Sequence, residues 1–165
     1  MEWNEVVQVD ISGTRIAAKD AMVMLSEGET EPGPPFVNVQ PGLYVAEIDL
    51  ASARHCRRFR IRRVESNPKL GRALQRLEID CAKAAFVDYD TLHSAVRADY
   101  ESYESWTEME LDDELVSNFS GIIKFGGAPI VYAQSGDGDG SYKTFELVEG
   151  ENIVGLECQF ELPSF

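Results

Sequence analysis

Cys56-Arg-Arg-Phe-Arg-Ile-Arg-Arg-Val64 is the stretch that decides the fold, because its side chains alternate in character along the chain. Phe59 and Ile61 fall on one face of an extended backbone. The opposite face carries Arg58, Arg60 and Arg62. Such alternation is typical of a strand with one apolar face and one polar face, so the segment predicts a β-strand.

Similar patterns on both sides of this stretch predict further strands. Leu43-Tyr-Val-Ala-Glu-Ile-Asp-Leu50 follows a Pro-Gly turn signal and alternates in the same way. Other strand-like segments are residues 6–11, 15–19, 74–79, 84–87, 122–125, 130–133, 142–148 and 153–160. Residues 27–35 read as an acidic loop, because proline and glycine interrupt any regular pattern there.

The pattern becomes helical in the 90–120 region. Asp90 or Thr91 is a candidate N-cap for a helix that runs to about Tyr103. Apolar residues from Leu111 to Phe119 suggest a second short helix. We therefore expect an α+β fold, one domain over residues 1–165, built mainly from antiparallel sheet with one or two short helices.

Composition bounds the class of protein. Apolar residues make up 44% of the chain, and no apolar stretch approaches the roughly 20 residues that span a bilayer. The first residues are acidic and do not resemble a secretory signal. Cys56, Cys81 and Cys158 are odd in number and widely spaced, which favours reduced thiols in a cytoplasm. We expect no membrane association.

Charge is distributed very unevenly. The net charge of −14 disfavours nucleic acid as a partner. Residues 51–83 nevertheless contain ten Lys and Arg against three Asp and Glu, whereas residues 99–114 contain eight acidic residues and no basic one. The chain therefore offers two candidate interaction surfaces of opposite sign.

Each surface has two interpretations at this stage. Arg58, Arg60 and Arg62 either form ion pairs within the chain or bind an anion or an acidic partner. Tyr100, Tyr103 and Trp106 lie among the helical acids. If those rings are exposed they suit an interface with a basic protein, and otherwise they pack inward.

Metal and catalytic motifs are weak. Asp137, Asp139 and Ser141 could begin a calcium loop, but the required glycine and the final glutamate are replaced by Tyr142 and Val148. A hairpin turn explains the same glycines. The residues His55, Cys56, Cys81 and His93 lack the spacing of a zinc site. We expect no catalytic residues, no metal and no cofactor.

Four motifs occur in an order that resembles the bacterial family catalogued as domain of unknown function 4241. They are Ser12-Gly-Thr-Arg-Ile-Ala-Ala-Lys-Asp20, Val39-Gln-Pro-Gly-Leu-Tyr-Val-Ala-Glu-Ile48, Phe86-Val-Asp-Tyr-Asp-Thr91 and Gly138-Asp-Gly-Ser-Tyr142. The resemblance covers residues 9–160. It implies no catalytic residues, because none is assigned to that family.

These observations lead to one functional expectation and one alternative. We expect a non-catalytic, cytoplasmic, bacterial interaction protein with a basic protein partner, of the kind that an immunity-type inhibitor of a toxin would have. The alternative is an enzyme or a small-ligand-binding protein with a pocket between sheet and helices.

Overall fold

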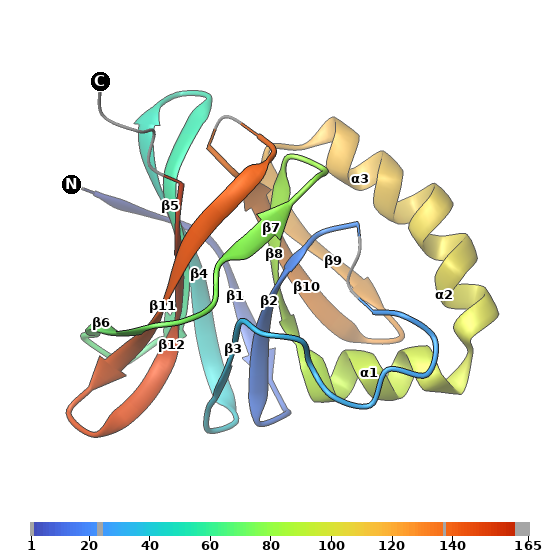
Figure 1. Cartoon of the computed structure of the whole chain (residues 1–165), viewed down its shortest axis with the longest axis horizontal. Helices are drawn as coiled ribbons and strands as arrows, with labels where there is room; N and C mark the ends of the chain where they lie inside the picture. The colour runs from blue at the N-terminus through green and yellow to red at the C-terminus, as the bar shows by residue number, and fades with distance from the viewer. Residues whose placement is uncertain (1, 23–24, 137, 161–165) are drawn as a thin grey trace.

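The computed structural model describes residues 2–22, 25–136 and 138–160, and its strands form two antiparallel sheets (Figure 1). The seven-stranded sheet has the order β1-β4-β5-β12-β11-β6, and β7 pairs with β11 beside this path. The strands are β1 (Trp3–Ile11), β4 (Gly42–Ser52), β5 (His55–Arg63), β6 (Lys69–Ala73), β7 (Leu77–Ile79), β11 (Gly140–Glu149) and β12 (Asn152–Gln159).

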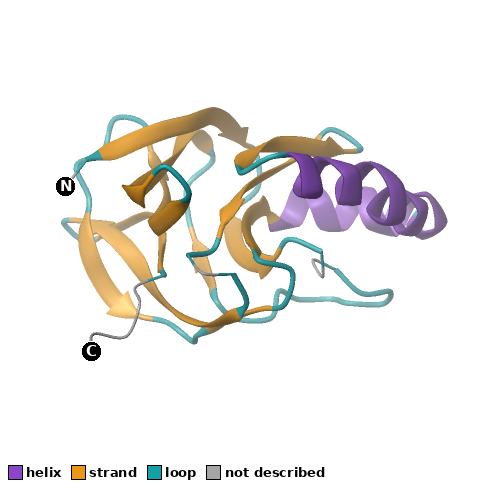
Figure 2. Cartoon of the chain, turned by 90° about the horizontal axis from the view of Figure 1, so that it is seen from above, coloured by secondary structure: helices purple, strands orange, loops and turns teal. Residues whose placement is uncertain are grey.

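The five-stranded sheet has the order β3-β2-β8-β10-β9, and the helices lie against its outer face. Figure 2 shows the helices gathered at one end of the molecule, away from the larger sheet. The strands are β2 (Arg15–Asp20), β3 (Phe36–Asn38), β8 (Lys83–Asp88), β9 (Ser120–Phe125) and β10 (Ala128–Gln134). The helical segments are α1 (Tyr89–Ala98), α2 (Tyr100–Trp106), the π-helix η1 (Thr107–Leu111) and α3 (Asp112–Ser117).

The main core fills the space between the two sheets. Phe59 and Ile61 on β5 enter this core, as the alternation of the stretch predicts. Phe59 stacks on Phe86 of the smaller sheet with ring centroids 4.3 Å apart. The polar side chains of β5 lie on the opposite face of the larger sheet, so this strand keeps the alternating pattern.

The smaller sheet is buried on both faces, which explains its more continuous apolar strands. On β10, Val131 faces the core between the sheets, while Ile130 and Tyr132 face the helices. Leu92, Tyr103 and other helical side chains complete this second cluster. The buried side chains of this cluster lie between the smaller sheet and the helices.

The expected class, a mainly antiparallel β-structure with helices near residues 90–120, is confirmed at this level. The helix boundaries differ from the prediction. Asp88, and not Asp90 or Thr91, caps α1, and α1 ends at Ala98 well before Tyr103. Asp99 interrupts the helix because its side chain accepts a hydrogen bond from the Ser102 backbone and caps a new segment. That segment continues without a break through the π-helix to residue 117.

The predicted hairpin at the Gly-Asp-Gly stretch is wrong. β10 belongs to the smaller sheet and β11 to the larger one, so the stretch crosses between sheets. Gly136 adopts a φ of +50°, and a Cβ there would lie 2.9 Å from the Phe160 carbonyl oxygen. Glycine is needed at this crossing because the backbone is left-handed and the residue after β12 approaches closely.

One buried carboxylate joins the start of the chain to the first helix. The Asp88 side chain accepts hydrogen bonds from the backbone amides of Ser12 at 2.9 Å and Gly13 at 3.1 Å. It also accepts one from the Thr91 hydroxyl at 2.8 Å while it caps α1. Two of the four motifs that carry the family resemblance meet at this carboxylate.

Replacement of this carboxylate should be costly. We expect Asp88→Ala to lower the free energy of unfolding by about 3 kcal/mol, because the helix cap is lost and the amides of Ser12 and Gly13 lose the buried carboxylate that accepts from them. Asp99→Ala is the matched control, since Asp99 also caps a helix but is exposed. Chemical denaturation of both variants checks this prediction, and a loss at Asp88 no larger than that at Asp99 contradicts it.

Candidate functional site

The arginine face of β5 forms ion pairs with two carboxylates of the adjacent strand β4. Arg58 Nε lies 3.0 Å from Asp49 Oδ2. Arg60 Nε and Arg62 Nε lie 2.9 Å and 2.8 Å from the same oxygen, Glu47 Oε1. The acids that pair with the arginines therefore come from the neighbouring strand, and the helical acids make none of these pairs.

Further contacts complete this charged layer on the outer face of the larger sheet. The Trp3 ring of β1 lies under two guanidinium groups, with its centroid 4.4 Å from Arg58 Cζ and 4.0 Å from Arg60 Cζ. Glu157 of β12 lies directly opposite Arg60 in the strand register. We call the residues Glu47, Asp49, Glu157, Arg58, Arg60 and Arg62 the charged layer.

The three carboxylates of the charged layer differ in how well they are neutralised. Burial alone would raise the pKa of Glu47 and of Asp49, but hydrogen bonds and charges from the arginines outweigh it and lower both pKa values. Burial raises the pKa of Glu157. The hydrogen bond that Gln159 donates to this carboxylate and the charges of Arg58 and Arg60 act in the opposite direction but do not outweigh burial. Glu157 is thus the carboxylate of the charged layer whose negative charge is least stabilised by its surroundings.

Two neutral substitutions should therefore change stability in opposite directions. A lowered pKa stabilises the fold above the usual pKa of a glutamate, so Glu47→Gln should cost about 3 kcal/mol at pH 7. That loss should shrink as the pH falls through the range where Glu47 protonates. A raised pKa destabilises the fold at neutral pH, so Glu157→Gln should increase the free energy of unfolding at pH 7.

Denaturation curves between pH 7 and about pH 3.5 measure both effects. The gain in the Glu157 variant should also disappear at low pH, where the native carboxyl group is already protonated. If Glu157→Gln destabilises the protein at pH 7, or if Glu47→Gln does not, our assignment of the two carboxylates is contradicted.

The helical aromatic residues pack inward. Tyr103 and Trp106 are only 3% and 8% exposed, and both rings lie against Phe125 of β9. Tyr100 is half-buried. The prediction that these rings are exposed at an interface is therefore wrong for Tyr103 and Trp106, because both rings pack in the core between the smaller sheet and the helices.

The outward surface of the same helix is acidic and carries unusual apolar side chains. Met109 is 70% exposed and Val116 is 79% exposed. The acids that are exposed around them are Asp99, Glu101, Glu104, Glu108, Glu110, Asp112 and Asp113. Glu114 is the exception, because the Tyr132 hydroxyl donates a hydrogen bond to it. We call residues 99–117 with these outward side chains the acidic helix.

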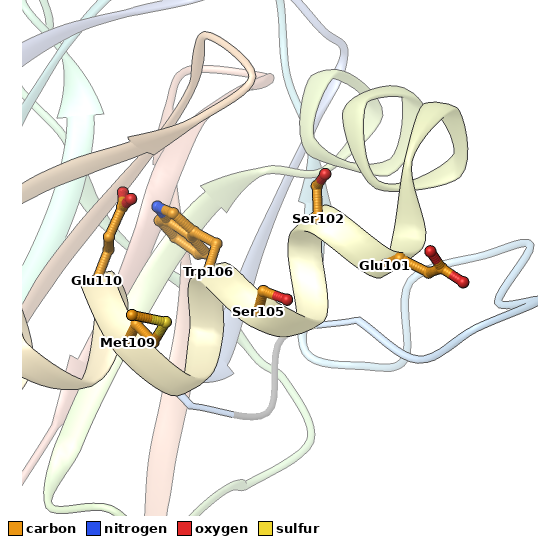
Figure 3. A pocket seen from close by; sticks show the side chains of 6 residues that line it. All are labelled: Glu101, Ser102, Ser105, Trp106, Met109 and Glu110. Atoms are coloured by element: carbon orange, nitrogen blue, oxygen red, sulfur yellow. The ribbon is translucent and has the colours of Figure 1, made fainter.

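A shallow hollow of about 380 Å³ lies along α2 and η1. Its side chains are Glu101, Ser102, Ser105, Trp106, Met109 and Glu110 (Figure 3). Trp106, Met109 and Glu110 gather at one end and Glu101 lies at the other. The hollow places the exposed Met109 side chain between carboxylates at its two ends, which suits a lysine or arginine side chain of a partner. The π-helix forms part of it, and such turns are frequent at functional sites.

The candidate calcium ligands have other roles. Asp139 Oδ1 accepts a hydrogen bond from the Ala82 amide at 3.0 Å, and the Ser141 hydroxyl donates to Glu78 at 2.7 Å. Asp137 lies outside the described residues. Among the described residues, no three His, Cys, Asp or Glu side chains are grouped so that they could hold a metal ion. These interactions connect the sheet crossing to β7 and to the turn before β8.

The cysteines are unpaired thiols in the described structure. Cys56 and Cys158 are buried, and burial raises the pKa of both. Cys81 is half-buried, and burial raises its pKa to about 11. A thiol with a raised pKa is a poor nucleophile at neutral pH.

Comparison with known proteins finds no match to this chain among family models, curated proteins or solved structures. The resemblance to domain of unknown function 4241 therefore stays a prediction. None of the helices in residues 2–22, 25–136 and 138–160 has the length and hydrophobicity to cross a membrane.

Proposed function

We propose that this chain is a non-catalytic, cytoplasmic bacterial protein that binds a basic protein partner through the acidic helix. An immunity-type inhibitor of a basic toxin is the form of that function that its charge suits best. Membership of the family of unknown function remains part of the proposal. The alternative, a protein that acts on or binds a small molecule, draws support only from a separate cavity described below.

The main support for this proposal is that Met109 and Val116 are exposed on the acidic helix. Acidic residues surround them, and this helix contains no basic residue. Isolated surface acids are common, and so are isolated apolar side chains. Their combination on one helix places apolar contact area inside a strongly negative field. Interfaces of this kind gain affinity from the apolar centre and association rate from the surrounding charge.

The charged layer strengthens this argument. The charged layer holds Arg58, Arg60 and Arg62, and these three arginines are paired with Glu47 and Asp49. They are therefore not available to neutralise the acidic helix. Seven exposed carboxylates that repel one another make the free helix less stable, and a basic partner would relieve that repulsion.

The spacing of the acids describes the partner further. A helix rises about 1.5 Å per residue, so the acids from Asp99 to Glu114 follow one another at an average of about 3 Å along the axis. One strand of DNA carries a charge about every 3.4 Å. The spacing of negative charge along this helix is therefore similar to that along a DNA strand. A partner protein with a basic groove that binds a polyanion would fit this charge density.

Crosslinking in the native host tests the proposal. A photoreactive amino acid at Met109 should yield one discrete crosslinked product with a basic protein, because this side chain lies at the centre of the acidic helix. The matched control is the same amino acid at Leu70, which is 50% exposed on β6 and distant in the fold from the helices. Mass spectrometry identifies the product.

A charge-neutral version of the helix completes the test. The triple substitution Glu104→Gln, Glu108→Gln and Asp112→Asn should reduce the yield of the Met109 product by about tenfold or more. Equal yields at both positions, an acidic partner, or a yield that the triple substitution leaves unchanged would each contradict the proposal.

A further inference from the structure

A second and more enclosed cavity lies between the loop that follows β2 and helix α1. Its volume is about 300 Å³. The loop contributes Leu25, Glu27 and Glu29, and the helical side contributes Val96 and Arg97. The cavity is separate from the hollow on the acidic helix, because the two have no lining residue in common.

The loop wall of the cavity is negatively charged, and part of it is firmly held. The Tyr89 hydroxyl donates a hydrogen bond to Glu29 Oε2 at 2.9 Å, and His93 Nε2 lies 2.5 Å from the Glu29 carbonyl oxygen. Burial and the Glu29 carboxylate raise the pKa of Tyr89, so the tyrosine stays a donor. Lys19 also lies in the field of Glu29, and burial lowers its pKa.

The helical wall carries the opposite charge. Arg97 is exposed in the last turn of α1 and lines the same cavity. Among the described residues, Arg97 makes no ion pair with Glu27 or Glu29, although ion pairs elsewhere in the chain are resolved. Opposite charges thus face one cavity from two sides without meeting, which leaves room for a molecule that carries both signs.

The floor of the cavity is apolar. Leu25 and Val96 are buried, and the half-buried Tyr100 ring borders them. A cavity of this volume holds about ten water-sized groups, which is close to the size of leucine. Apolar floors with a few convergent polar groups are typical of small-molecule sites.

We propose that this cavity binds a free amino acid with an aliphatic side chain. The ammonium group faces Glu29 and Glu27, the carboxylate faces Arg97, and the side chain lies on Leu25 and Val96. The site shares no lining residue with the hollow, and its one residue on the acidic helix is Tyr100, whose ring borders the floor of the cavity.

Three matched ligands test the charge pattern by isothermal titration calorimetry. Leucine carries both charged groups, 3-methylbutylamine lacks the carboxylate, and 4-methylpentanoate lacks the amine. We expect leucine to bind about tenfold more tightly than either analogue, since it alone meets both walls. Equal affinities for the three ligands, or no binding of leucine at millimolar concentration, would overturn the proposal.

Two variants assign the charges to their walls. Glu29→Gln keeps a hydrogen-bond acceptor for Tyr89. It should lower the affinity for leucine about tenfold and leave the affinity for 4-methylpentanoate unchanged. Arg97→Gln should lower the affinities for leucine and 4-methylpentanoate and leave the affinity for 3-methylbutylamine unchanged. Glu31→Gln is the control, because Glu31 belongs to the same loop but does not line the cavity.

A final variant separates this proposal from the proposed function. The triple substitution in the acidic helix should leave leucine binding intact, whatever it does to crosslinking at Met109. If leucine affinity falls with that triple substitution, the assignment of the ligand to the cavity is contradicted.

Discussion

The pairing of β5 arginines with β4 carboxylates is the interaction on which the charge distribution of this protein depends. Glu47 and Asp49 are buried, so each needs cationic partners to remain ionised. Arg58, Arg60 and Arg62 supply them from the adjacent strand at hydrogen-bond distance. This register also sends Phe59 and the other inward side chains of β5 into the core between the sheets. The pairing of β5 with β4 thus places the apolar side chains of β5 in the core and its arginines in ion pairs with β4.

The functional consequence is an asymmetric surface. Because the arginines are used internally, the acids of residues 99–113 remain the dominant exposed charge, and they surround Met109. The helix that carries them is anchored by Tyr103 and Trp106, whose rings lie in the second core cluster. The same helix is therefore rigidly seated on one side and open to a partner on the other. Rigid presentation reduces the entropy that a partner must overcome on binding.

The sequence predicts those elements whose signal is local. Alternation in residues 43–50 and 56–64 correctly predicts strands, and periodicity correctly indicates helices near residue 100. Contacts between distant segments were not predictable. A local pattern does not reveal that Glu47 lies opposite Arg60 or that β10 and β11 belong to different sheets. It also does not reveal that the loop containing Glu29 lines a cavity beside α1. The aromatic helix residues were ambiguous because both the core and an interface use such rings.

The most direct test of the account is a map of the surface potential in solution. Paramagnetic co-solutes of opposite charge can be compared through their effects on amide proton relaxation in NMR spectra. We expect the cationic probe to enhance relaxation most strongly along residues 99–117. We expect the anionic probe to show no comparable enhancement over β5, because Arg58, Arg60 and Arg62 are paired with Glu47 and Asp49. Accumulation of the anionic probe over β5, or no preference for the cationic probe along the acidic helix, would contradict it.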